Sequence, residues 1–142
     1  MAALHADAFP TNQAWSSTQF EALLNQESIS ALAITKMGDL VAGALVQIAA
    51  DQAEILTLAT ARKHRRQGLA KHLLTSWEAE LLPRGVSTWL LDVAEDNHSA
   101  VELYKNMGFK LDGRRPGYYK RNAEKRVDAL LMSKPMARQA AT

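Results

Sequence analysis

The feature that most constrains the fold is an amphipathic helix between two strand-like segments. Across about residues 68–82, apolar side chains recur at helical spacing, at Ala70, Leu73, Leu74, Trp77 and Leu81. The run AEILTLAT precedes this helix and is mostly apolar, so we expect a strand covered on both faces. Pro83 and Gly85 end the helix, and VSTWLLDVA, rich in β-forming residues, predicts a central strand after it.

The N-terminal part of the chain predicts a helix followed by a β-hairpin. WSSTQFEALLNQ carries a capping box, in which Ser16 is followed three residues later by Gln19. We expect the buried stripe of this helix to be Phe20, Leu23 and Leu24. The run ALAITKMGDLVAGALVQI divides into two apolar β-type segments around residues 37–39, where Met-Gly-Asp signals a hairpin turn.

The C-terminal part predicts a short helix and a last pair of strands. Asn97 is placed to cap a helix that Gly108 ends, with an apolar stripe of Ala100, Leu103, Tyr104 and Met107. FKLDG and RVDALLMSK predict strands on either side of a basic loop that contains tyrosines. With no repeat, low-complexity stretch or linker, residues 1–142 predict one domain, an α/β sandwich around a mixed sheet.

Composition excludes several classes of site and of location. The chain has no cysteine, which fits a reducing compartment and excludes disulfides, thiolate metal sites and a cysteine nucleophile. The histidines, at positions 5, 64, 72 and 98, lack the spacing of metal ligands, so we expect no metal. No apolar run approaches the roughly 18 residues that span a bilayer, and MAALHADAFP does not resemble a signal peptide. We therefore expect a cytoplasmic protein without a membrane partner.

The stretch HRRQGLAKHLL, residues 64–74, predicts an anion site. The start of a helix leaves about four backbone N–H groups without partners and carries a partial positive charge. Gly68 leaves the backbone open to a ligand, and Arg65, Arg66 and Lys71 add positive charge around the same turn. The turn is neither a P-loop nor a dinucleotide fingerprint. A solvated basic helix start, with Gly68 as a simple helix boundary, is the alternative.

Three ordered motifs resemble the GNAT superfamily of N-acetyltransferases. RRQGLA matches its signature as Arg65-x-x-Gly68-x-Ala70, and WLLDVAEDNHSAVELYKNMGF is similar to the downstream strand and helix of the family. The stretch GRRPGYYKRNAEKRVDALLMSK resembles the subgroup of protein N-terminal acetyltransferases that includes the ribosomal-protein-alanine enzymes. The resemblance covers about residues 5–136 and implies a GNAT-type sandwich with helices on both faces of the sheet.

The resemblance implies acetyl-CoA as co-substrate and assigns residues to hold it. Backbone groups of Leu58, Ala59 and Thr60 would line up with the pantetheine arm, with one N–H facing the thioester oxygen. The pyrophosphate would rest on amides along the turn, at Arg65, Arg66, Gln67, Gly68, Leu69, Ala70 and Lys71. Asn97 matches a cofactor-contacting asparagine of the family, and its role as a helix cap is compatible with that contact.

Two further residues match catalytic positions of the family. Tyr104 matches the tyrosine that protonates the leaving thiolate beside the cofactor; a phenol with a pKa near 10 is neutral at working pH. Asp92 stands where the family carries a glutamate that serves as general base. Its side chain is one methylene shorter, so a bridging water is an alternative to direct contact with the amine. Glu95 and His98 are the substitutes for this role, and a purely structural carboxylate is the other interpretation of Asp92.

Tyr118 and Tyr119 resemble paired tyrosines that contact the substrate peptide in N-terminal acetyltransferases. A ring with a hydroxyl tip suits a peptide backbone. The arginines and lysines beside them favour a solvated loop, with attraction of an acidic partner or ribosomal RNA as the alternative. We expect the partner to be the N-terminus of a ribosomal protein, with alanine first, and no direct contact with nucleic acid.

Two departures from the family keep other functions open. The aspartate at position 92 is one, and the apparent absence of the first edge strand is the other. The nearest rival is transfer to a small amine or a lysine side chain, since this fold serves many acceptors. A non-catalytic module that binds acetyl-CoA or RNA is the rival from another class.

Overall fold

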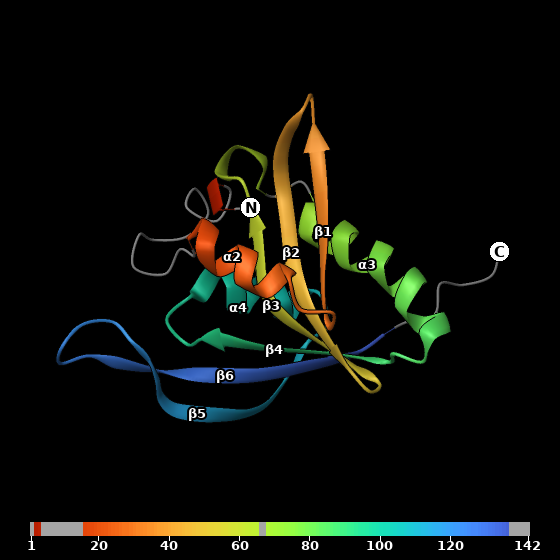
Figure 1. The fold of residues 1–142 in the computed structure, drawn as a ribbon. Coiled ribbons are helices and arrows are strands. Elements are labelled where there is room, and N and C mark those ends of the chain that lie inside the picture. Colours follow the sequence, from red (N-terminus) through yellow and green to blue (C-terminus); the bar gives the residue numbers. More distant parts are fainter. Residues whose placement is uncertain (1, 4–15, 66–67, 137–142) are drawn as a thin grey trace.

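The computed structural model describes residues 2–3, 16–65 and 68–136 (Figure 1). The predicted contacts of Arg66 and Gln67, and the side chain of Phe20, lie outside this part of the chain. The elements are α2 (Ser17–Leu24), β1 (Ile29–Lys36), β2 (Asp39–Ala49), β3 (Gln52–Thr60), η1 (Arg62–His64), α3 (Leu69–Leu81), η2 (Leu82–Arg84), β4 (Thr88–Ala94), α4 (His98–Asn106), β5 (Lys110–Lys120) and β6 (Arg126–Pro135).

The strands form one mixed sheet in the order β1-β2-β3-β4-β6-β5. Only β3 and β4 run parallel, because α3 crosses over between them. All other neighbouring strands are antiparallel. The predicted α/β sandwich with a mixed sheet is confirmed.

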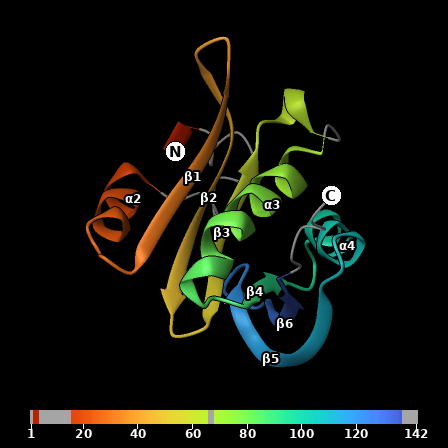
Figure 2. The same ribbon diagram turned by 90° about the vertical axis from the view of Figure 1, so that its right-hand side faces the viewer.

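Helices cover both faces of the sheet, and Figure 2 shows α2 and α3 on opposite sides of it. The larger core lies between the sheet and the helices α3 and α4, and includes Trp77, Trp89 and Tyr104. A smaller cluster around Ile29 and Leu45 lies under α2. Along β2, successive side chains enter the larger and the smaller core in turn, because neighbouring side chains of a strand point to opposite faces.

Two burial expectations need correction. In α2, Leu23 packs against the sheet, whereas Leu24 is 45% exposed, because neighbouring residues on a helix point about 100° apart. In β3, buried and partly buried residues alternate, so the strand is not equally covered on both faces. The capping box of Ser16 and Gln19 and the turn at Met37 and Gly38 form as predicted.

The parallel strands β3 and β4 separate halfway along their length. They are paired only over Gln52–Ile55 and Thr88–Leu91. Immediately afterwards β3 has a bulge at Leu56, which has no partner of its own on β2. A bulge bends its strand and increases the local twist. From there β3 continues beside β2 to Thr60, while β4 continues beside β6, and the sheet opens between them.

The tyrosines at positions 118 and 119 lie in a strand and not in a loop. β5 extends to Lys120 by means of a bulge, in which residues 116–118 face the single residue Asp128 of β6. The bulge contains Pro116 and Gly117, and the φ of Gly117 is +59°. In the sequence alone, this pair is typical of a turn. The pairing with β6 continues the strand beyond this apparent break.

Candidate active site

A cleft of about 700 Å³ opens where β3 and β4 separate. One wall is the end of β3, formed by Leu58, Ala59 and Thr60. A second is the basic turn and the start of α3, formed by Arg65 and residues 68–71. Asn97 and one face of α4 form the third. The structure thus brings together all the predicted cofactor residues that it describes, except Tyr104.

The first turn of α3 is open toward the cleft. Gly68 is the N-cap residue of α3, with a φ of +71°, and no side chain caps the helix. A Cβ at Gly68 would meet no atom within 4 Å, so the backbone is uncovered on this side. Arg65 and Lys71 add positive charge at the same wall. An anionic ligand is attracted both to the helix N-terminus and to these side chains.

The end of β3 offers a strand edge to the cleft. Leu58, Ala59 and Thr60 pair with β2 on one side. On the other side, the β4 ladder has already ended at Ile55. An extended ligand with amide groups can therefore hydrogen-bond to this edge as an added strand would.

Asn97 has the predicted structural role as well as a place in the cleft. Its Oδ1 accepts a hydrogen bond from the backbone N–H of Ala100 at 3.2 Å, which caps α4. The same residue lines the cleft. The two interpretations of Asn97 are compatible.

The sequence reasoning missed several residues of the cleft. Asp96, directly before the α4 cap, lines it, as does His64. The others come from one side of α4: Ser99, Ala100, Glu102, Leu103 and Asn106. Their spacing of three and four residues along the helix was the available signal, because such residues share a helix face.

The predicted catalytic residues Asp92 and Tyr104 are not among the residues that line the cleft. Tyr104 is buried, 8% exposed, with its ring edge-on to Phe109 at 5.5 Å between centroids. Burial, with a smaller contribution from Tyr119, raises the pKa of Tyr104 far above its usual value. Asp92 is partly buried, and its Oδ2 lies 4.0 Å from the guanidinium of Arg115.

Tyr119 connects these residues electrostatically. Burial, followed by the Asp92 carboxylate and Tyr118, raises its pKa to about 12, although Arg121 and Arg115 act in the opposite direction. Since the charge of Tyr119 is also felt at Tyr104, the three groups lie within electrostatic range. Asp92 of β4, Tyr104 of α4 and Tyr119 of β5 therefore lie near one another, although none of the three lines the cleft.

The two tyrosines of β5 are held by arginines. Their rings meet edge-to-face, 5.1 Å between centroids. The guanidinium of Arg115 lies 5.3 Å from the ring centre of Tyr118, and that of Arg121 lies 5.6 Å from the ring centre of Tyr119. Tyr118 is 50% exposed, so an aromatic surface faces outward here. Such a surface suits contact with a peptide.

A profile of the Acetyltransferase (GNAT) family matches residues 1–109 of the 142 residues. The chain belongs to the GNAT family. The recognition made from the three sequence motifs is confirmed. The enzyme is an acyltransferase, as members of this family are.

Two curated relatives cover nearly all of this GNAT enzyme. It is 34% identical over 133 residues to the ribosomal protein bS18-alanine N-acetyltransferase of Escherichia coli (strain K12), a match that covers 93% of this chain and 85% of the relative. It is 32% identical over 132 residues to the protein of the same name from Salmonella typhimurium, with the same coverage of 93% and 85%.

Solved structures show the same fold. The crystal structure of the ribosomal-protein-S18-alanine N-acetyltransferase from Escherichia coli matches with a TM-score of 0.82 and 29% identity, covering 98% of this chain and 87% of that one. A GNAT family acetyltransferase from Elizabethkingia anophelis, solved with acetyl-CoA bound, matches with a TM-score of 0.74 and 17% identity. It covers 94% of this chain and 88% of that one, and it supports the fold alone.

The described residues contain neither a membrane-spanning helix nor a cluster of metal ligands. None of the helices in residues 2–3, 16–65 and 68–136 has the length and apolarity needed to cross a bilayer. In the same part of the chain, no three His, Asp or Glu side chains gather as ligands for a metal ion.

Proposed function

We propose that this GNAT enzyme transfers the acetyl group of acetyl-CoA to the N-terminal α-amine of a ribosomal protein that begins with alanine. One observation carries the proposal. The cleft joins a free strand edge to an open, basic helix N-terminus, and Arg121 connects it to Tyr119 of β5, because Arg121 pairs with Asp96 in the cleft wall and lies over the Tyr119 ring. The names of the relatives with 34% and 32% identity support the choice of acceptor.

Acetyl-CoA is held by the two parts of the cleft that fit its two chemistries. The pyrophosphate binds to the first turn of α3, where N–H groups, Arg65 and Lys71 offer positive charge. The pantetheine arm, which carries amides, lies along the edge of β3 at residues 58–60. This orientation directs the thioester toward the end of β4. A backbone N–H of the β3 edge faces the thioester oxygen and stabilises the oxyanion.

Asp92 accepts a proton from the attacking amine. A free α-amine has a pKa of about 7.7–8.0, so part of the acceptor is already deprotonated near neutral pH, and the base has little work to do. The aspartate side chain is short, and a bridging water extends its reach. The amine attacks the thioester directly, because the mechanism uses no covalent nucleophile.

Tyr104 donates a proton toward the leaving sulfur. Because burial raises its pKa, the phenol stays protonated at working pH. A buried phenolate is costly for the same reason, so the phenol holds its proton until the thiolate develops. Tyr118 and Tyr119 contact the backbone of the acceptor peptide.

The test is the release of free CoA thiol with acetyl-CoA and a peptide that begins with alanine. The N-terminally blocked twin of that peptide is the matched control, and a third peptide, blocked but with an internal lysine, tests side-chain transfer. Turnover with the free α-amine only supports the proposal. Turnover with the lysine peptide, or binding of acetyl-CoA without any turnover, overturns it. Asp92→Asn then shows whether the carboxylate acts as base, since loss of the base lowers kcat most at a pH below the α-amine pKa of about 7.7–8.0.

A further inference from the structure

We propose that Arg121 is a positioning residue that couples acceptor binding to acetyl-CoA binding through its ion pair with Asp96. The inference rests on the proposed function, because it names the cleft as the cofactor site and the tyrosine pair as the acceptor site. Both residues lie in stretches that resemble the family, and Arg121 is one of the cations beside the tyrosine pair, but the resemblance assigns a role to neither. Arg121 lies at the start of the turn after β5, and Asp96 lies in the turn between β4 and α4.

The link between Arg121 and Asp96 is the best-formed ion pair of this region. Both oxygens of Asp96 accept hydrogen bonds, one from Nε and one from Nη2 of Arg121, each at 2.8 Å. The side chain of Arg121 is 13% exposed, whereas those of Arg114 and Arg115 are 53% and 54% exposed. The Arg121 hydrogen bonds hold the pKa of Asp96 below its usual value, although burial opposes them. The side chain of Asp96 is 35% exposed, so it is the bidentate geometry that fixes both the orientation and the distance of the pair.

Each end of the link touches a different substrate site. At one end, the guanidinium of Arg121 lies over the ring of Tyr119. The backbone N–H of Arg121 donates a hydrogen bond to the backbone carbonyl of Lys125 at 2.9 Å. At the other end, Asp96 lines the cleft and directly precedes Asn97, the cap of α4. The helix that begins there carries Tyr104. The side chain of Arg121 thus connects β5, which carries the proposed acceptor tyrosines, to the wall of the proposed cofactor cleft.

The consequence is a coupling free energy between the two sites. A ligand that orders the Asp96 turn from the cleft also orders Arg121 and the Tyr119 ring. By thermodynamic linkage, the acceptor must then change the affinity for CoA by the same factor as CoA changes the affinity for the acceptor. A pair with a purely structural role contributes to stability and gives no such reciprocity.

The test is equilibrium binding of the alanine peptide with and without CoA, the product, which allows no transfer. The variants are Arg121→Gln, Arg121→Lys, Asp96→Asn and the double variant Arg121→Gln/Asp96→Asn. The matched control is Arg84→Gln, the same change at an exposed arginine of η2 outside the cleft and the acceptor strand. Thermal unfolding of each variant is recorded separately.

In the wild type, we expect CoA to lower the dissociation constant of the peptide about fivefold or more. The peptide should lower the dissociation constant of CoA by the same factor. Each variant brings this coupling factor close to one. The double variant loses no more of the coupling than the single variant with the larger loss. Arg121→Lys does not restore the factor, because an ammonium group cannot form the bidentate fork. The control keeps the wild-type factor.

The results separate the link from the proposed function. Three results overturn the proposed coupling. The wild type shows none, or the variants keep it, or the effects of the two single variants add in the double variant. A wild type that binds CoA but no alanine peptide overturns the proposed function. In that case the coupling, which rests on the proposed function, falls with it. A wild type that binds both CoA and the peptide without coupling overturns the coupling alone.

Discussion

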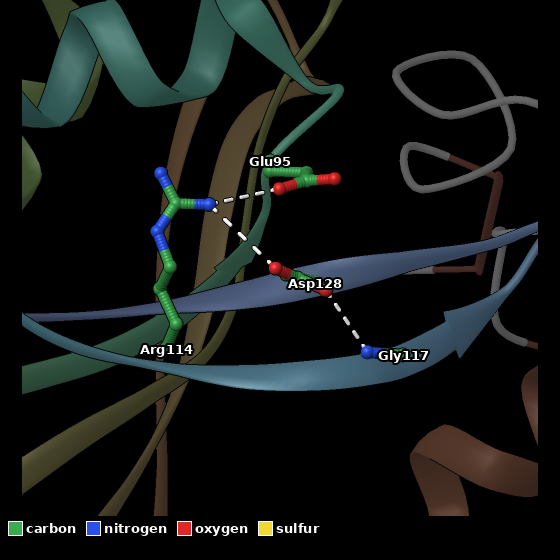
Figure 3. Close-up of polar contacts among 4 residues, drawn as sticks. All are labelled: Glu95, Arg114, Gly117 and Asp128. Atoms are coloured by element: carbon green, nitrogen blue, oxygen red, sulfur yellow. Dashed lines mark hydrogen bonds and ion pairs between the residues drawn. The ribbon is translucent and has the colours of Figure 1, made fainter.

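The backbone N–H of Gly117 donates a hydrogen bond to Oδ1 of Asp128 at 3.0 Å, and this contact holds the bulge of β5 in place (Figure 3). The other carboxylate oxygen of Asp128 faces Arg114 at 3.7 Å, and Arg114 also pairs with Glu95 at 2.9 Å. The carbonyl of Asp128 accepts from the Glu95 N–H at 3.0 Å. A single residue of β6 therefore connects the tyrosine strand to the end of β4.

Replacing Asp128 should weaken acceptor binding without affecting the cofactor. Asp128→Ala removes the acceptor of the Gly117 N–H, and we expect the acceptor KM to rise roughly fivefold, the equivalent of one hydrogen bond of about 1 kcal/mol. Asp128→Asn keeps an oxygen that accepts this bond and should have a smaller effect. Steady-state kinetics measure the change, with Asp112→Ala, an exposed carboxylate of β5, as the control. Equal effects of Asp128→Ala and Asp112→Ala contradict the role of the bulge.

Removing the Tyr104 hydroxyl should slow the chemical step. Tyr104→Phe keeps the ring against Phe109 and leaves the core filled. The loss of a general acid lowers kcat by roughly 10²-fold or more. The dissociation constant of acetyl-CoA, measured by calorimetry, should change less than threefold. A kcat within threefold of the wild type shows that the thiolate takes its proton from another group.

A side chain at Gly68 should weaken acetyl-CoA binding more than it destabilises the fold. In Gly68→Ala the new Cβ meets no protein atom, so the cost to folding is the strain of a positive φ, about 1 kcal/mol. In the proposed function, acetyl-CoA approaches the backbone at the position of this Cβ, so we expect the dissociation constant of acetyl-CoA to rise about tenfold or more. Gly38→Ala, with a φ of +85° at the hairpin turn, carries the same strain and serves as the control. An unchanged cofactor affinity in Gly68→Ala rules out close approach to this backbone.

Alkaline pH should destabilise the folded protein through the buried phenol of Tyr104 and the partly buried phenol of Tyr119. The folded-state pKa of Tyr119 is about 12, and that of Tyr104 is also raised, whereas an unfolded tyrosine ionises near 10. Above pH 10 the folded state therefore binds more protons than the unfolded state. The stability from these groups is complete below about pH 10 and is lost as the pH rises toward 12 and beyond. Urea unfolding between pH 9 and 11.5 measures this loss, which Tyr104→Phe/Tyr119→Phe should reduce.

Much of the fold was predictable because its signals are local. The capping box at Ser16, the cap at Asn97 and the start and buried stripe of α3 each depend on residues within one or two helical turns. The same holds for the turn at Met37 and Gly38. The basic helix start was predictable for the same reason, since an open helix N-terminus needs only its own first turn.

What the sequence by itself determined is the order and type of the elements and the open, basic helix start at Gly68, because these follow from side-chain periodicity and backbone conformation. The tertiary structure decided the rest. Leu56 bulges only because β3 pairs with β2, and that bulge opens the sheet into a cleft. Tyr118 and Tyr119 belong to a strand only because β6 pairs across Pro116 and Gly117. Arg121 meets Asp96, 25 residues away, because the sheet places β5 near the end of β4, and no local pattern specifies such a contact.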